Sequence, residues 1–206
     1  MPDFSFEDSC GYDMVVGIDE VGRGPWAGPV VAASVFIPKE IRKSPFILEL
    51  NDSKKLSKPT REKLFHIITQ ECLYGVGIVS PKKIDEINIL QASFLAMEQS
   101  LEALTPSCAY ALIDGNKIPE FKTFPHLQKQ AIVKGDSHSN SIAAASIVAK
   151  VTRDKIMEDL HQQTPYYGWN TNSGYGTKAH QDGLEKHGIT DHHRKSFAPI
   201  KKLLSN

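Results

Sequence analysis

The chain has 206 residues, of which 40% are hydrophobic and 23% are charged, and this ordinary globular composition excludes disordered, fibrous and collagen-like proteins. Its 24 basic and 24 acidic side chains balance, so net charge by itself indicates no nucleic-acid partner, and any such surface must be a local cluster. No apolar run is long enough to span a bilayer, and the three cysteines are too widely spaced to suggest a disulfide framework or a zinc ribbon.

The N-terminal segment argues against export. Residues 1–8 are acidic and lack the basic start of a signal peptide. We therefore expect a cytoplasmic protein with reduced thiols and no membrane association. Its length fits one domain, and we expect it to act as a monomer.

The first half of the chain predicts two strands joined by a glycine-rich turn. The apolar run at residues 14–18 predicts a buried strand that ends at two acids, Asp19 and Glu20. Residues 30–37 predict a second strand. Because the link of residues 21–29 is short, we expect the two strands to pair antiparallel and the sheet to be mixed.

Helical patterns follow. Ser57 is the expected N-cap of a helix that runs to about residue 71, with Pro59 in its first turn. Residues 73–79 predict a third strand, and Pro81 predicts a turn. A second helix, ending before Pro106, is predicted from apolar residues at steps of four, three, four and three: Leu90, Phe94, Met97, Leu101 and Leu104.

Two further strands are expected next to acidic residues. Residues 108–113 predict a strand that ends at Asp114, and residues 131–133 predict a short strand shortly before Asp136. Helices are expected over three later segments: residues 141–161, 178–187 and 199–204. Strands mixed with helices in this way predict an α/β fold, with a sheet between layers of helices.

Carboxylates therefore stand near the ends of three predicted strands: Asp19 with Glu20, Asp114, and Asp136. If the strand ends meet at one edge of the sheet, the carboxylates repel one another unless cations lie between them. Oxygen ligands suit Mg²⁺ or Mn²⁺, and two such ions can orient a water and stabilise the leaving oxygen of a phosphodiester. Each acid taken alone is more often a turn residue. Because strand neighbours point to opposite faces, we expect the chain to leave the extended form at Glu20 if both acids serve one site.

The turn at residues 22–27 also follows the dinucleotide-binding pattern G-x-G-x-x-A. In that motif the turn opens a helix whose N-terminus holds the pyrophosphate. Here Pro25 and Pro29 flank the turn and a β-branched run follows, so we do not expect a dinucleotide cofactor. The glycines still allow backbone amides to approach a phosphate or a sugar closely.

Seven blocks, which cover most of the chain, resemble the ribonuclease HII family in content and order. They are residues 17–35 (GIDEVGRGPWAGPVVAASV), 51–57 (NDSKKLS), 84–93 (IDEINILQAS), 112–117 (LIDGNK), 134–154 (KGDSHSNSIAAASIVAKVTRD), 173–180 (SGYGTKAH) and 193–197 (HRKSF). Each block alone is weak to moderate, but together they are specific. Arg23 and the short leader before the first strand favour ribonuclease HII over ribonuclease HIII, which usually has lysine at that position and an extra N-terminal domain.

The resemblance implies a ribonuclease H-like fold, with residues 1–206 as one catalytic domain and about 165–206 as a helical, substrate-binding C-terminal extension. It implies hydrolysis of the RNA strand of RNA/DNA hybrids and incision 5′ to ribonucleotides embedded in duplex DNA, leaving a 3′-hydroxyl and a 5′-phosphate. The cofactor is expected to be Mg²⁺ or Mn²⁺, with two ions bound alongside substrate. By position, the catalytic metal-binding carboxylates are Asp19, Glu20, Asp114 and Asp136.

The resemblance also implies residues that recognise the substrate. In the family, a glycine-rich turn and a tyrosine detect the ribose 2′-hydroxyl, the group that distinguishes RNA from DNA. The matching residues here are Gly22, Arg23, Gly24 and Tyr175. Lys54 and Lys55 stand where phosphate contacts are expected, although such lysines equally fit a solvated loop.

Two other functions stay open at this point. Metal-free RNA cleavage by histidines would leave a cyclic phosphate and would survive excess chelator; the candidates are His138, His187, His192 and His193. A non-catalytic module on the same fold would bind RNA/DNA hybrids without cutting them under any divalent ion. Paired histidines in a basic tail are more often surface or phosphate contacts, which weighs against cleavage by histidines.

Overall fold

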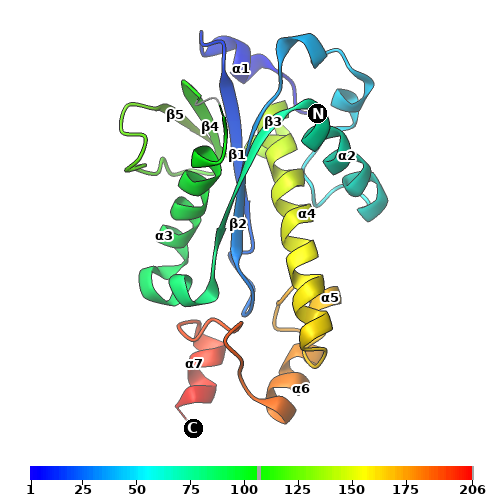
Figure 1. Ribbon diagram of the computed structural model, residues 1–206, viewed down its shortest axis with the longest axis vertical. Helices are drawn as coiled ribbons and strands as arrows, with labels where there is room; N and C mark the ends of the chain where they lie inside the picture. Colours follow the sequence, from blue (N-terminus) through cyan, green and yellow to red (C-terminus); the bar gives the residue numbers. More distant parts are fainter. Residues whose placement is uncertain (106–107, 206) are drawn as a thin grey trace.

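A five-stranded sheet in the order β3-β2-β1-β4-β5 forms the centre of the computed structural model, which describes residues 1–105 and 108–205 (Figure 1). The strands are β1 (Val15–Val21), β2 (Val30–Phe36), β3 (Leu73–Val79), β4 (Tyr110–Asp114) and β5 (Gln128–Ile132). β1 pairs antiparallel with β2 and parallel with β4. The sheet is therefore mixed, as the short link after the first strand predicts.

Helices cover both faces of the sheet (Figure 1). They are α1 (Ser5–Ser9), α2 (Lys58–Glu71), α3 (Pro81–Glu102), α4 (Asn140–Gln163), α5 (Trp169–Asn172), α6 (Lys178–His187) and α7 (Ala198–Leu204). Short 3₁₀ turns are η1 (Lys39–Ile41), η2 (Pro45–Glu49) and η3 (Gly135–Ser137). Within residues 1–105 and 108–205, no helix is both long and apolar enough to cross a membrane.

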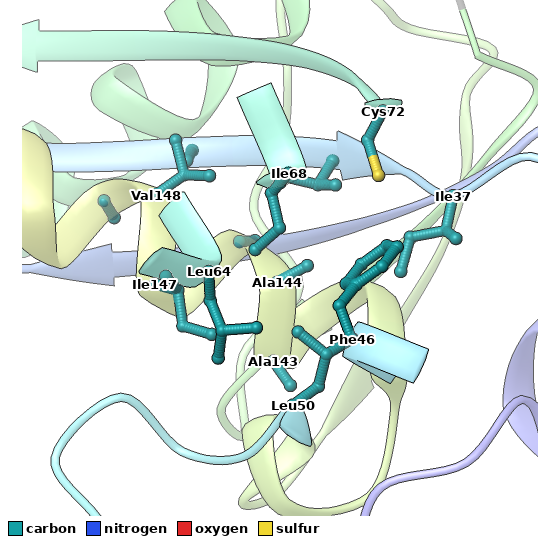
Figure 2. Close-up of a cluster of buried hydrophobic side chains, with 14 of the residues drawn as sticks. Ile37, Phe46, Leu50, Leu64, Ile68, Cys72, Ala143, Ala144, Ile147 and Val148 are labelled. Atoms are coloured by element: carbon teal, nitrogen blue, oxygen red, sulfur yellow. The ribbon is translucent and has the colours of Figure 1, made fainter. Parts of the chain in front are cut away.

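α4 packs closely on β1 because small residues line the contact. A Cβ at Gly17 of β1 would lie only 2.1 Å from the carbonyl carbon of Ser141, near the start of α4. α2 packs behind α4, and Figure 2 shows buried side chains of the two helices, Leu64 and Ile68 with Ile147 and Val148, meeting in one cluster. This close approach holds the start of α4 beside β1.

α3 covers the other face of the sheet. Val16 and Ile18 of β1 share a buried cluster with Ala92, Ala96 and Met97 of α3. Alternate residues of β1 therefore face α4 and α3, as expected for an extended strand that is buried on both sides.

Several boundaries differ from the predictions. Pro81 does not make a turn: Ser80 accepts a hydrogen bond from the Lys83 amide, and Pro81 begins α3, because the first helical turn does not need the missing amide hydrogen. α3 kinks at Asn88, whose φ is +66° and whose side chain accepts from the Leu90 amide. Leu104 is buried but lies beyond the helix, and Pro106 lies outside the described residues.

The predictions for residues 30–79 agree better with the structure. β2, α2 and β3 occur where they are expected, and Ser57 caps α2 by accepting from the Thr60 amide. β4 begins two residues later than predicted and β5 three residues earlier, while α4, α6 and α7 occupy the predicted helical segments. α1 and α5 were not predicted, since helices of five and four residues are too short to show a periodic apolar face.

The C-terminal helices α5 to α7 lie at the end of the sheet where β1 turns into β2 (Figure 1). A separate cluster of buried side chains holds them there: Tyr167, Trp169, Leu184 and Ile200 pack with Ala27 of the turn and Met157 of α4. The C-terminal segment is thus packed directly against the glycine-rich turn.

Candidate active site

Asp19 and Asp114 lie next to each other at the end of a strand pair. The parallel pairing of β1 with β4 runs from Val15 and Tyr110 to Ile18 and Ile113. Asp19 and Asp114 are the next residue on each strand, and β4 ends at Asp114. The two carboxylates therefore stand where the strand beside β1 stops.

The two adjacent acids of β1 emerge on opposite faces of the sheet. Asp19 has the same orientation as Gly17, which faces α4, and Glu20 has the same orientation as Ile18, which packs in the α3 cluster. Our expectation that the chain leaves the extended form at Glu20 is wrong, because pairing with β2 continues through Val21. The two acids instead approach Asp114 from either side of the strand end, and the charge of Asp114 raises the pKa of both.

Asp136 is brought to the same place by the turn η3. The Gly135 amide donates to Asp114 Oδ1 at 2.7 Å, which ties this turn to the end of β4. Lys134 begins the turn in a left-handed conformation, with φ of +56°. Asp136 is 8% exposed, and its pKa is raised by burial and by the charges of Asp114 and Asp52.

All four predicted carboxylates thus converge in a region with little solvent. Asp19 is only 9% exposed, and its pKa is raised well above the ordinary value by burial and by the charges of Glu20, Asp114 and Asp136. Burial also raises the pKa of Glu20, although the Arg23 guanidinium opposes the rise. Glu20 Oε2 is buried and has no hydrogen-bond partner among residues 1–105 and 108–205. A divalent cation bound between these carboxylates would offset their mutual repulsion and give the unpartnered oxygen a ligand interaction.

The four carboxylates are near one another but are not arranged around a common point at which an ion could bind. Among residues 1–105 and 108–205, no three acidic, histidine or cysteine side chains are already arranged to hold an ion. The donor set itself fits Mg²⁺ or Mn²⁺, because it consists of carboxylate oxygens alone. Binding would require these side chains to move closer together.

Asp52 is a fifth acid of this site that the sequence interpretation missed. Its charge raises the pKa of both Asp114 and Asp136, and the charge of Lys54 lowers them. Lys55 Nζ donates to Ser137 Oγ of η3 at 3.0 Å. The loop of residues 51–57 therefore lies against the carboxylates, and its signal in the sequence was the block NDSKKLS, in which we singled out only the lysines.

The glycine-rich turn lies next to Glu20. The Arg23 guanidinium contacts Glu20 Oε1 at 3.1 Å. Gly22 has a φ of +93°, and a Cβ there would lie 2.2 Å from Arg153 Nε, so only glycine fits. β2 follows the turn where a dinucleotide-binding motif needs a helix, which excludes that motif.

Tyr175 is brought to this turn from a distant part of the chain. A Cβ on Gly24 would lie 3.2 Å from Tyr175 Cε1, so the tyrosine ring lies over Gly24. Tyr175 is 53% exposed, so part of the residue is accessible to a ligand. The turn therefore contacts Tyr175 at Gly24 and Glu20 through Arg23.

A hollow of about 160 Å³ opens beside the carboxylates. Its lining includes Glu20, Arg23 and Asp114, together with Phe94 and Lys117. Lys117 follows Asp114 in the block LIDGNK but was not among the predicted site residues. A larger cavity of about 540 Å³ lies between α2, α4 and α5. None of the four acids lines it, so the size of a cavity does not locate the active site here.

Two of the histidines proposed for metal-free cleavage, His187 and His193, contact the rings of other side chains. His193 is 1% exposed, lies 3.1 Å from His180 through their Nε2 atoms, and accepts from the Thr190 amide at 3.0 Å. Burial and His180 lower the pKa of His193 to about 4, so it is neutral at pH 7. His187 stacks on Tyr166 with ring centres 4.0 Å apart. These contacts give His193 a structural role and weigh against acid–base chemistry.

Comparison with known proteins agrees with the geometry. The family model described as Ribonuclease HII matches residues 16–200. A ribonuclease HII of Wolbachia pipientis subsp. Culex pipiens is 49% identical over 98% of both chains, and one of Desulfotalea psychrophila is 51% identical over 95% of this chain and 85% of the relative.

Solved structures show the same fold. The ribonuclease H2 of Pyrococcus horikoshii OT3 superposes with a TM-score of 0.77 and 27% identity, covering 93% of this chain and 97% of that one. The ribonuclease HII of Archaeoglobus fulgidus, solved in complex with PCNA, gives a TM-score of 0.73 and 30% identity, covering 88% and 93%. The predicted ribonuclease H-like fold is thereby confirmed. The chain belongs to the ribonuclease HII family and is an endoribonuclease of the ribonuclease H type.

Proposed function

We propose that this enzyme hydrolyses the RNA strand of RNA/DNA hybrids and incises duplex DNA 5′ to embedded ribonucleotides, leaving a 3′-hydroxyl and a 5′-phosphate. Ribonucleases H act on RNA/DNA hybrids, which supports the substrate class. The observation that carries the proposal is the adjacency of two sets of residues. The turn that Tyr175 covers contacts Glu20 through the 3.1 Å pair with Arg23, so a ribose recognised at the turn lies next to the carboxylates.

We propose that Asp19, Glu20, Asp114 and Asp136 bind Mg²⁺ or Mn²⁺, with two ions in the complex with substrate. Their burial, their mutual effect on pKa and the unpartnered Glu20 oxygen support a cation between them. A ribonuclease HIII with the same fold and 20% identity has been solved in complex with Mn²⁺. Such ions would polarise the scissile phosphate and orient the attacking water. The carboxylates would hold these cations next to the turn that recognises the ribose.

We assign substrate recognition to the turn of Gly22, Arg23 and Gly24, to Tyr175, and to the lysines of the 51–57 loop. The amides of the turn can donate to the 2′-hydroxyl, while the exposed Tyr175 ring offers a stacking face for a sugar or base. Lys54 and Lys55, which lie beside the carboxylates, would contact phosphates on the same strand.

We propose residues 1–206 as one catalytic domain in which residues 165–206 extend the substrate-binding surface. Tyr175 lies in this extension, and its cluster of buried side chains includes Ala27 of the turn, which supports the assignment. All four carboxylates come from one chain, which favours a monomer, and the three free cysteines favour the cytoplasm. Sedimentation of the purified protein tests the first of these.

The test uses duplex DNA with one ribonucleotide, incubated with Mg²⁺ or Mn²⁺, followed by identification of the product ends. We expect one nick 5′ to the ribonucleotide, a 3′-hydroxyl, and no cleavage in excess chelator. Asp114→Asn should abolish the nick while the protein still unfolds cooperatively. A cyclic phosphate product, or full activity of this variant, would refute the assignment.

The alternative is a non-catalytic module that binds hybrids. The family membership and the four converging carboxylates favour the enzyme. Binding of RNA/DNA hybrid with no cleavage under either ion would support the module instead.

A further inference from the structure

Arg194 is a fully buried arginine in contact with the glycine-rich turn. It is 0% exposed, and its guanidinium donates to the carbonyls of Gly22 at 2.5 Å, Arg23 at 2.9 Å, Gly28 at 3.0 Å and Pro29 at 3.2 Å. Within residues 1–105 and 108–205, no carboxylate forms an ion pair with it. Burying a charge without a carboxylate partner costs stability. Here four backbone carbonyls bind the buried guanidinium instead, which indicates that Arg194 does more than fill space in the core.

The bonds from Arg194 determine which way the turn presents its amides. In a planar trans peptide the N–H points opposite to the C=O of the same peptide unit. Because the Gly22 and Arg23 carbonyls point inward to Arg194, the amides of Arg23 and Gly24 point outward. Neither amide donates to any acceptor in the described part of the chain.

These two free donors lie beside the residues that the proposed function assigns to ribose recognition. The Tyr175 ring lies over Gly24, and the Arg23 side chain contacts Glu20. A second buried arginine, Arg153, donates to the Ala27 and Pro29 carbonyls and to the Ser173 carbonyl, two residues before Tyr175. Arg153 thereby joins the tyrosine segment to the far part of the turn, whereas Arg194 orients the peptides at its tip.

We propose that Arg194 is a positioning residue for ribose specificity: by binding the Gly22 and Arg23 carbonyls, it aims the Arg23 and Gly24 amides at the sugar 2′-hydroxyl. This inference rests on the proposed function. Lysine at position 194 keeps a positive charge but presents its donors from one atom, so it cannot hold carbonyls spread along the turn. Arg194→Lys should therefore lose ribose discrimination while phosphate contacts persist.

The test measures binding rather than turnover, in an Asp114→Asn background with Mg²⁺. Affinities are compared for a DNA duplex with one ribonucleotide and for the same duplex in DNA alone. The preference for the ribonucleotide should fall about tenfold in Arg194→Lys, as expected from loss of one or two hydrogen bonds, while affinity for the all-DNA duplex changes less than about twofold. Retention of the full preference by a folded Arg194→Lys would overturn the proposal.

Arg42→Lys is the matched control. Arg42 is also an arginine with little exposure, and it donates to the Ile37 carbonyl at 3.4 Å and lies over the Phe4 ring. It pairs with Asp8 of α1, a helix at the opposite end of the molecule from α5 to α7 (Figure 1). This variant should keep the ribonucleotide preference. If the Asp114→Asn protein itself shows no preference, the proposed function fails rather than the role of Arg194.

A second measurement needs no substitution at Arg194. Amide hydrogen exchange of the wild-type protein should be fast at Arg23 and Gly24 without nucleic acid. The ribonucleotide duplex should slow it, and the all-DNA duplex should not. Protection of both amides in the free protein would show that they point inward and would overturn the proposal.

Discussion

Acidification is expected to destabilise the protein through His193. The Trp169 indole and the Thr190 amide are donors only, so His180 Nε2 and His193 Nδ1 must both accept. His193 Nε2 then donates to His180 Nε2, 3.1 Å away, and His180 Nδ1 donates to the Tyr175 carbonyl. Each histidine carries one proton, and the network exists only while both are neutral.

The size of the effect follows from the pKa of His193. Burial and His180 lower it to about 4 in the folded protein, whereas the unfolded chain takes up a proton near the ordinary value of 6.5. The unfolded state therefore binds more protons between these values, and stability that is complete above pH 6.5 is lost as the pH falls. The loss amounts to about 2 kcal/mol at pH 5 and about 3 kcal/mol below pH 4.

Urea unfolding at pH 7.5 and pH 5 measures this loss, and a His193→Gln variant isolates it. Carboxylates with raised pKa, such as Asp19, change stability in the opposite direction, but they are common to both proteins and cancel in the difference. We expect the variant to lose about 2 kcal/mol less on acidification than the wild type. His66→Gln, on the exposed side of α2, should behave as the wild type. Equal pH dependence of wild type and His193→Gln would refute the neutral network.

Three other changes have expected outcomes. Tyr175→Phe should lower kcat/KM on an embedded ribonucleotide up to about tenfold with stability unchanged, because the hydroxyl of this half-exposed residue is lost but the ring remains. An unchanged kcat/KM would show that the hydroxyl takes no part in recognition. Leu64→Ala should lower the free energy of unfolding in urea by about 2–5 kcal/mol, whereas Leu48→Ala, at a side chain 77% exposed, should leave it nearly unchanged. Gly17→Ala should lower the midpoint of thermal unfolding sharply, because its Cβ would meet Ser141 of α4 at 2.1 Å; an unchanged midpoint would contradict this packing.

Local patterns in the sequence predicted most of the elements. Apolar runs indicated β2 and β3, and Ser57 with Pro59 indicated the start of α2, because these signals depend only on neighbouring residues. The acids Asp19 and Asp114 were also recognisable, because each follows an apolar strand. The resemblance then supplied the expected roles, which the experiments above test.

Local patterns could not show how the acids reach one another. The sequence interpretation required the chain to leave the extended form at Glu20. In the structure β1 stays paired with β2 through Val21, and β4 ends beside it. The end of β4 is set by its pairing, not by a residue of β1, so no pattern within β1 could reveal it. Asp52 was missed for the same reason: nothing near it in the chain indicates that its loop lies against η3.

What the sequence by itself determined is the set of strands and helices and the chemical identity of the acidic and glycine-rich segments. Only the tertiary structure decided that Tyr175 covers Gly24 and that Arg194 orients the turn at Gly22, residues separated by 151 and 172 positions. Side-chain periodicity and capping act over a few residues and can be read along the chain. Contacts between distant segments depend on how the helices and strands pack together, and a single sequence carries no local signal of that packing.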